Sequence, residues 1–176
     1  MDEIISNLKN IALSGNDIYN ACEKNIKILK YGQLRNFKNI DDAFDPYDAI
    51  ALLYESKPNY GHWVLLLRHP KKKTIEFFDS YGIFPDDQIK KIPDEINKMV
   101  GQGFIYLTDL LVKSPYKIIY NSEPVQKMST KISSCGRHLC LRYLLRNLPM
   151  NKYIEILKSD KFNDSDDIVT YLTAFI

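Results

Sequence analysis

Two short apolar runs joined by a basic turn are the feature that most constrains the fold of this chain. The runs span residues 63–68 and 74–79, and the sequence HPKKK separates them. Apolar runs of this length on either side of a turn are typical of two strands that form an antiparallel hairpin. The start of the first strand and the end of the second lie at the same end of such a hairpin. The sequence therefore predicts that His62 and Asp79 lie close together.

The other periodic segments predict an α+β fold around this hairpin. Further strands are expected over residues 49–54 and 116–120. Apolar residues at helical spacing and local capping signals predict helices over residues 3–13, from Asp17, over 94–100, over 135–147 and after 164–166. We expect one domain, residues 1–176, with a small central mixed β-sheet flanked by helices.

Two segments carry more specific expectations. In the last helix, Ile168, Leu172 and Phe175 recur at helical spacing and are expected to face inward. Residues 25–47, which contain several aspartates and a proline, are expected to form an irregular surface segment.

Cys135 stands at the predicted start of a helix, in the segment Ser133-Ser134-Cys135-Gly136. Ser133 or Ser134 could cap this helix, which would place Cys135 in its first turn. Unpaired N–H groups and the helix dipole favour an anion at that position. A thiolate is such an anion, and it is the nucleophilic form of cysteine. We therefore interpret Cys135 as a candidate nucleophile, with a buried core cysteine as the alternative.

Three other residues complete a thiol-nucleophile pattern. His62 can act as the base, Asp79 can orient its imidazole, and Gln126 can donate a side-chain N–H to an oxyanion. The alternatives are a surface histidine, an aspartate that caps a turn and an ordinary loop glutamine. Rival or fallback candidates for these roles are His69 and His138 as the base, and Asn121 and Ser122 as the donor.

Composition and charge limit the classes of protein to which this chain can belong. The chain has 176 residues, 45% of them hydrophobic, which suits a domain with its own core. Its net charge of +2 is too small to indicate nucleic-acid binding by itself. We interpret Lys71–Lys73 as a solvated hairpin tip, with phosphate binding as the alternative. The three cysteines lack the spacing of zinc ligands, so no metal is expected. The small number of cysteines, together with the lack of a recognisable signal peptide or membrane-spanning run, indicates an intracellular protein.

The segment over residues 61–82, GHWVLLLRHPKKKTIEFFDSYG, resembles the adenovirus maturation protease family, the adenains. In that family a His-Trp strand, a basic hairpin turn and a strand ending in Phe-acid-x-aromatic-Gly follow in the same order. Val125-Gln126 and Ser134-Cys135-Gly136 resemble the family's Val-Gln and Ala-Cys-Gly elements. The order His, acid, Gln, Cys is shared with the wider clan that includes SUMO-specific proteases. The resemblance covers about residues 49–148.

The sequence departs from the adenains in two places. The gap between Gln126 and Cys135 is longer than in that family, which affects the loop that would carry the oxyanion donor. The adenovirus enzyme is activated by a peptide disulfide-linked to a cysteine before the Val-Gln element. This chain has no cysteine between Asp79 and Cys135, so we expect no disulfide-linked activator at that site, with a non-covalent activator as the alternative.

The resemblance implies a papain-like or adenain-like cysteine endopeptidase that uses a His62, Asp79 and Cys135 triad with Gln126 in the oxyanion hole. Such viral enzymes cut capsid and core precursors next to glycine during virion maturation. We therefore expect Gly61, Trp63 and Gly136 to line a narrow cleft, with core packing as the alternative for Trp63. The resemblance also implies action in the host cytoplasm or viral factory and packaging in the virion.

The sequence is compatible with several kinds of partner and with more than one function. We expect polypeptide substrates, no required cofactor, no membrane association and a monomer, with weak DNA binding and a peptide or DNA activator allowed by the resemblance. The alternatives are a deubiquitinating or SUMO-removing protease, an acetyltransferase with the same residue order, and a catalytically inactive scaffold or binding protein.

Overall fold

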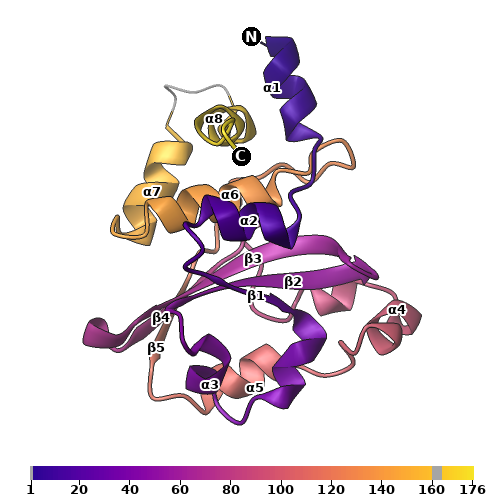
Figure 1. Cartoon of the computed structure of the whole chain (residues 1–176), viewed down its shortest axis with the longest axis vertical. Helices are drawn as coiled ribbons and strands as arrows, with labels where there is room; N and C mark the ends of the chain where they lie inside the picture. The colour runs from indigo at the N-terminus through magenta and orange to yellow at the C-terminus, as the bar shows by residue number, and fades with distance from the viewer. Residues whose placement is uncertain (1, 160–163) are drawn as a thin grey trace.

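The computed structural model describes residues 2–159 and 164–176, and a five-stranded mixed sheet runs through the middle of the molecule (Figure 1). The strands follow chain order across the sheet: β1 (Lys27–Lys30), β2 (Ala49–Lys57), β3 (Tyr60–His69), β4 (Thr74–Phe78) and β5 (Lys117–Tyr120). The two outer pairings are parallel and the two inner pairings are antiparallel. The predicted α+β class with a mixed sheet flanked by helices is confirmed.

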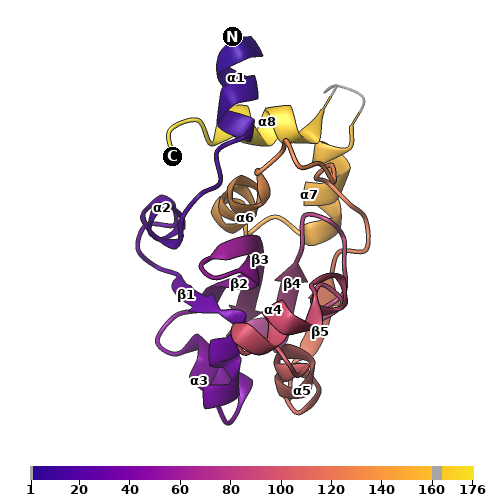
Figure 2. The ribbon, with the colours of Figure 1, turned by 90° about the vertical axis from the view of Figure 1, so that its right-hand side faces the viewer.

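Helices cover both faces of the sheet (Figures 1 and 2). One face carries α2 (Gly15–Ala21), α6 (Cys135–Leu144) and α7 (Met150–Leu157), with α1 (Asp2–Lys9) and α8 (Ser165–Leu172) packed together beyond α6. The other face carries α3 (Ile40–Phe44), α4 (Asp94–Met99) and α5 (Tyr106–Val112). Three short 3₁₀ segments, Tyr31–Asn36, Pro70–Lys72 and Ile89–Lys91, are also present in the described chain.

The alternation of side chains along the strands divides the core into two parts. In β2, Ala51 and Leu53 belong to the hydrophobic cluster beneath α6, whereas Ile50 and Leu52 belong to the cluster on the opposite face. Successive strand residues point to opposite faces, so a strand buried on both sides contributes to two cores. The apolar residues of β2 are therefore continuous in sequence rather than alternating with polar ones.

The predicted hairpin is confirmed. Leu65 pairs with Phe78 and His69 pairs with Thr74 in an antiparallel ladder. The expected strands at 49–54 and 116–120 correspond to β2 and β5, and the expected helix at 94–100 corresponds to α4. The prediction for residues 25–47 is wrong, because β1, a 3₁₀ segment and α3 form there and bury Leu29, Leu34 and Phe44.

The first helix ends at Lys9 rather than at residue 13. Leu13 instead turns into the core, and its carbonyl accepts a hydrogen bond of 3.0 Å from Trp63 Nε1. The tertiary contact therefore overrides the helical spacing of the local sequence.

The predicted inward face of the last helix is wrong. Leu172 and Phe175 are exposed, at 48% and 71%, and Ile168 is only half-buried, whereas Val169, Thr170 and Thr173 are buried. Polar contacts set this orientation: Arg137 Nη1 donates to the carbonyl of Thr173 at 2.6 Å. Asp164 caps the helix as expected, accepting from the N–H of Asp166 at 2.9 Å.

A buried ion pair joins α6 to the sheet. Arg142 Nε and Nη2 donate to the two carboxylate oxygens of Glu76 at 2.6 and 2.9 Å. The same guanidinium donates to the carbonyls of Leu145 and Leu148, both at 2.9 Å, just beyond the end of α6. These bonds satisfy carbonyls at the end of the helix, which stops at Leu144 rather than at residue 147.

We expect the substitution Arg142→Met to lower the free energy of unfolding by about 3–5 kcal/mol, because it leaves the buried Glu76 carboxylate without its partner. Urea unfolding monitored by circular dichroism measures this. Lys152→Met, which removes one side of an exposed ion pair with Glu155, is the control and should leave the unfolding midpoint unchanged. Equal midpoints for the two variants would contradict the structural role of Arg142.

Candidate active site

His62 and Asp79 meet at one end of the β3–β4 hairpin. His62 Nε2 lies 2.7 Å from Asp79 Oδ1, and both side chains are buried. The same Asp79 oxygen accepts from the backbone N–H of Tyr81 at 2.8 Å. Because Nε2 is engaged by the carboxylate, Nδ1 is the imidazole nitrogen left for a second partner. The sequence prediction that these two residues are adjacent is confirmed.

Asn121 fixes the backbone of Asp79 from the other side. Its Oδ1 accepts from the Asp79 N–H at 3.0 Å, and its Nδ2 donates to the Asp79 carbonyl at 2.6 Å. Nδ2 also donates to the carbonyl of Glu123 at 3.2 Å. The amide of Asn121 is therefore committed to the strand end, which makes it a poor candidate for the oxyanion donor.

Cys135 is the first residue of α6, which packs against β3. Ser134 occupies the N-cap position as predicted, but its hydroxyl donates to Asp166 Oδ1 at 2.6 Å and does not cap the helix. The prediction of a serine cap is therefore wrong for Ser134, and the N–H of Ser133 instead donates to the Lys9 carbonyl. The first turn of α6 thus keeps N–H groups free of a side-chain cap beside the thiol.

The electrostatics of Cys135 and His62 favour a thiolate–imidazolium pair. Burial alone would raise the pKa of the Cys135 thiol, but the hydrogen bond and charge of His62 and the N–H groups of Trp63 and Gly136 hold this pKa below its ordinary value. Burial opposes the charged imidazolium, but Asp79, followed by Cys135, raises the pKa of His62 to about 10. Both shifts favour the charged forms, so the sulfur is prepared for nucleophilic attack.

Gln126 is held in one orientation by two residues that follow Asp79. Ser80 Oγ donates to Gln126 Oε1 at 2.6 Å, and Gln126 Nε2 donates to the hydroxyl of Tyr81 at 3.3 Å. The carbonyl of Ser80 also accepts from the backbone N–H of Gln126 at 2.9 Å. These contacts identify Nε2 as the donor end of the amide and leave its second N–H available for an oxyanion.

Tyr81 contacts three of the four candidate residues, and sequence reasoning did not single it out. Its ring stacks on His62 with centroids 4.4 Å apart and planes 16° apart. Burial, followed by the charge of Cys135, raises the pKa of Tyr81 to about 12, so its hydroxyl stays neutral at physiological pH. The aromatic residue in the Asp-Ser-Tyr-Gly segment was the only sequence signal that could have indicated this residue.

The three residues expected to line a cleft each have a packing role. A Cβ on Gly61 would lie 1.8 Å from the carbonyl oxygen of Tyr54, so the close approach of β2 and β3 requires glycine there. A Cβ on Gly136 would lie 3.0 Å from that of Leu13. Trp63 is 7% exposed within the core cluster beneath α6. Packing therefore accounts for these residues, and their contact with substrate stays a prediction.

The rival histidines do not occupy the base position. His69 is half-buried at the far end of β3, beside the 3₁₀ turn. His138 is fully buried on α6, and its Nε2 lies 3.0 Å from Asp166 Oδ1. Of the three histidines, only His62 is in contact with Cys135.

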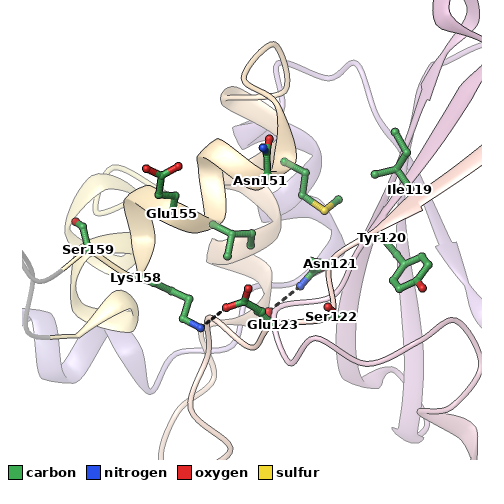
Figure 3. Close-up of a pocket in the computed structure, with 11 residues that line it drawn as sticks. Ile119, Tyr120, Asn121, Ser122, Glu123, Asn151, Glu155, Lys158 and Ser159 are labelled. Carbon is green, nitrogen blue, oxygen red and sulfur yellow. Dashed lines mark hydrogen bonds and ion pairs between the residues drawn. The ribbon is translucent and has the colours of Figure 1, made fainter.

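A cavity of about 710 Å³ lies between α7 and the segment that follows β5 (Figure 3). Its lining includes Asn121, Glu123 and Lys158, and the last two form an ion pair. It shares Asn121 with the site but is not lined by Cys135, His62 or Gln126. The cavity therefore lies apart from the pair formed by Cys135 and His62.

No group of three or more His, Cys, Asp or Glu side chains that could hold a metal ion occurs in residues 2–159 and 164–176. Within the same residues, none of the helices combines the length and the apolar character that crossing a bilayer requires.

Comparison with known proteins places the chain in a family. No family model matches it. It is 39% identical over 166 residues to "Uncharacterized protein V9" of Sputnik virophage, an alignment that covers 93% of this chain and 94% of that protein. The chain therefore belongs to the same family as this virophage protein.

Solved structures with partial likeness to this chain include a SUMO protease. The SUMO protease Ulp1, with its catalytic cysteine oxidised to a sulfinic acid, has a TM-score of 0.41 and 18% identity, covering 98% of this chain and 74% of Ulp1. ChlaDub1 from Chlamydia trachomatis has a TM-score of 0.40 and 16% identity, covering 98% and 75%. The central domain of Lpg1148 from Legionella pneumophila has a TM-score of 0.36 and 16% identity, covering 99% and 93%.

We expect iodoacetamide to alkylate Cys135 at a lower pH than it alkylates an ordinary thiol, because His62 stabilises the thiolate. The pair of Cys135 thiolate and His62 imidazolium should form once the pH exceeds the lowered pKa of the thiol. It should persist up to about pH 10, where His62 loses its proton. His62→Ala should move the midpoint of the alkylation–pH curve upward, and His69→Ala should not. Peptide mass spectrometry measures the alkylation of each cysteine separately. Cys135 is 8% exposed, whereas Cys22 and Cys140 are both 0% exposed. The same midpoint in His62→Ala and the unsubstituted protein would contradict the ion pair.

Proposed function

We propose that this protein is a cysteine endopeptidase with Cys135 as nucleophile, His62 as general base and acid, Asp79 as orienting residue and Gln126 as oxyanion donor. The observation that carries the proposal is the His62–Asp79 contact of 2.7 Å beside a buried cysteine with a lowered pKa at a helix start. A nucleophile, a base and a third group that orients the base make up the chemistry of covalent acyl transfer.

In the first step, the Cys135 thiolate attacks the carbonyl carbon of the scissile peptide and the carbonyl electrons move onto oxygen. The side-chain N–H of Gln126 and the backbone N–H of Cys135 donate to this oxyanion. As the intermediate collapses, the C–N bond breaks and His62 gives its proton to the leaving amine. The products are an acyl-thioester at Cys135 and neutral His62, whose tautomer Asp79 holds.

In the second step, neutral His62 removes a proton from water as the water attacks the thioester carbonyl. The C–S bond then breaks, the acid product leaves, and Cys135 returns as a thiolate beside the His62 imidazolium. The stacked Tyr81 ring shields the imidazole during both steps. No group outside the chain and water is required to balance the reaction.

For the substrate we propose viral capsid or core precursor polypeptides, cut next to glycine during particle maturation. The resemblance of residues 61–82 to the adenains and the membership in a family with a virophage protein support a viral role. The two reacting side chains are nearly buried, with His62 6% and Cys135 8% exposed. A narrow site suits an extended backbone with little side chain, as glycine provides. We place the enzyme in the infected cell and in the virion.

Cleavage of the precursors encoded beside this protein tests the function. We expect discrete cuts next to glycine by the unsubstituted protein, none by Cys135→Ala, and retained cutting by Cys140→Ala, whose thiol lies buried on the same helix. Mass spectrometry of the products identifies each cut, with a ubiquitin or SUMO fusion as the parallel substrate. Cuts confined to the fusion would assign the chain to modifier-removing proteases. Full cleavage by Cys135→Ala, or none by any form, would contradict the proposal.

A second test addresses the oxyanion donor. We expect Gln126→Ala to lower kcat about 100- to 1000-fold, because one donor to the oxyanion is lost. KM should change little, because the bond strengthens only as charge develops on the oxygen. Gln33→Ala, which changes an exposed glutamine on the 3₁₀ segment after β1, is the control. Equal kcat for Gln126→Ala and Gln33→Ala would remove Gln126 from the mechanism.

A further inference from the structure

Asp166, in the first turn of α8, is a fully buried carboxylate that contacts two segments distant in sequence. Its Oδ1 accepts from Ser134 Oγ at 2.6 Å and lies 3.0 Å from His138 Nε2. Its Oδ2 accepts from the backbone N–H of Lys127 at 3.0 Å. Asp166, Ser134 and His138 are each 0% exposed. One side chain therefore joins α6, α8 and the loop that carries Gln126.

The contacts of this carboxylate lie directly beside two proposed catalytic residues. Ser134 immediately precedes Cys135, and Lys127 immediately follows Gln126. His138 lies one turn further along α6 from the nucleophile. Because Asp166 holds groups adjacent to both residues, it limits how far the start of α6 and the Gln126 loop can move apart.

The start of α8 holds the Gln126 loop on both sides of the glutamine. Ser165 Oγ donates to the carbonyl of Val125, and Asp166 accepts from the N–H of Lys127. The side chain of Lys127 also pairs with Asp164 at 2.9 Å. Consecutive residues of α8 thus bind the backbone immediately before and after Gln126.

We propose that Asp166 is a positioning residue that sets the separation between the Cys135 nucleophile and the Gln126 oxyanion donor. This inference rests on the proposed function. Asp166 touches neither substrate nor the reacting atoms and acts through Ser134 and Lys127. An oxyanion donor must meet the developing charge within hydrogen-bond distance, so a small change in this separation affects catalysis more than binding.

Charge and burial support a positional role. Burial alone would raise the pKa of Asp166, but hydrogen bonds from His138 and Ser134 hold it below its ordinary value, so the carboxylate stays charged. A buried charge costs several kcal/mol in desolvation, and apolar residues of similar size often stabilise a fold as well or better. The apolar residues Leu172 and Phe175 of the same C-terminal segment are nevertheless exposed while Asp166 faces inward. The segment is oriented by its polar contacts rather than by its apolar face.

Asp166→Asn tests the inference, with Asp167→Asn as the matched control. The neighbouring Asp167 carboxylate pairs with Lys9 on α1 and is half-exposed. The side-chain carbonyl of asparagine at position 166 can still accept a hydrogen bond, but its amide nitrogen cannot accept one from the N–H of Lys127. We expect kcat on the glycine-containing precursor to fall on the order of 100-fold, with KM nearly unchanged. Asp167→Asn should leave both parameters within about twofold.

A readout without substrate separates this inference from the proposed function. The midpoint of Cys135 alkylation against pH should rise in Asp166→Asn, because a displaced start of α6 weakens the hydrogen bond from His62 that stabilises the thiolate. Ser134→Ala removes one hydroxyl and leaves the Asp166 carboxylate in place, and it should shift the midpoint in the same direction. This variant replaces Asp166→Asn in the test if Asp166→Asn does not fold. Circular dichroism confirms that each variant tested is folded.

The outcomes are distinguishable. A lower kcat and a raised midpoint in Asp166→Asn or Ser134→Ala, with Asp167→Asn unchanged, support the positioning role. If neither variant differs from Asp167→Asn in kcat or midpoint, or if the loss is confined to KM, the inference is wrong. Failure of the unsubstituted protein to cut any precursor would overturn the proposed function, and the alkylation midpoint would still decide whether Asp166 positions Cys135.

Discussion

The antiparallel pairing of β3 with β4 is the constraint on which the site depends. It brings His62 and Asp79 together at one end of the hairpin, where the carboxylate holds the imidazole in a buried contact of 2.7 Å. Burial removes competing water, so the charge of Asp79 acts strongly on the imidazole. The resulting imidazolium lowers the pKa of Cys135, and the reactivity of the thiol follows from the geometry of the hairpin.

The nucleophile helix is held to the rest of the molecule by polar contacts along its length. Arg142 joins its C-terminal half to Glu76 on β4, and Arg137 joins its first turn to the carbonyl of Thr173. Asp166 holds its N-terminal end through the N-cap residue Ser134. Buried hydrogen-bonded charges add directional constraints that apolar packing alone lacks. These three contacts together therefore fix the position of the Cys135 sulfur relative to His62.

The hairpin and the approximate positions of most long elements could be predicted from sequence because their signals are local. Apolar runs, a turn and capping residues predict the structure of segments whose contacts are with near neighbours in the chain. The adjacency of His62 and Asp79 followed from the hairpin alone. Gln126 was a candidate from its place upstream of Cys135, the family resemblance agreed with that role, and the structure fixes its amide through Ser80 and Tyr81.

The missed features all depend on contacts between distant residues. The inward face of α8 was predicted from apolar spacing, but its bonds to Ser134 and Arg137 turn that face outward. The Ser134 hydroxyl had a local capping signal, yet a buried carboxylate on α8 competes successfully for it. β1 was missed because four residues, Lys27–Lys30, carry too short a pattern and form a strand only beside β2.

The crystal structure of the protein with a peptide aldehyde ending in glycine tests the central claim most directly. The aldehyde should form a hemithioacetal with Cys135 Sγ, an adduct that resembles the tetrahedral intermediate. We predict that its oxygen lies within hydrogen-bond distance of Gln126 Nε2 and the Cys135 N–H, with His62 still bound to Asp79. An adduct at another residue, or an oxygen directed away from Gln126, would contradict the assignment of this site.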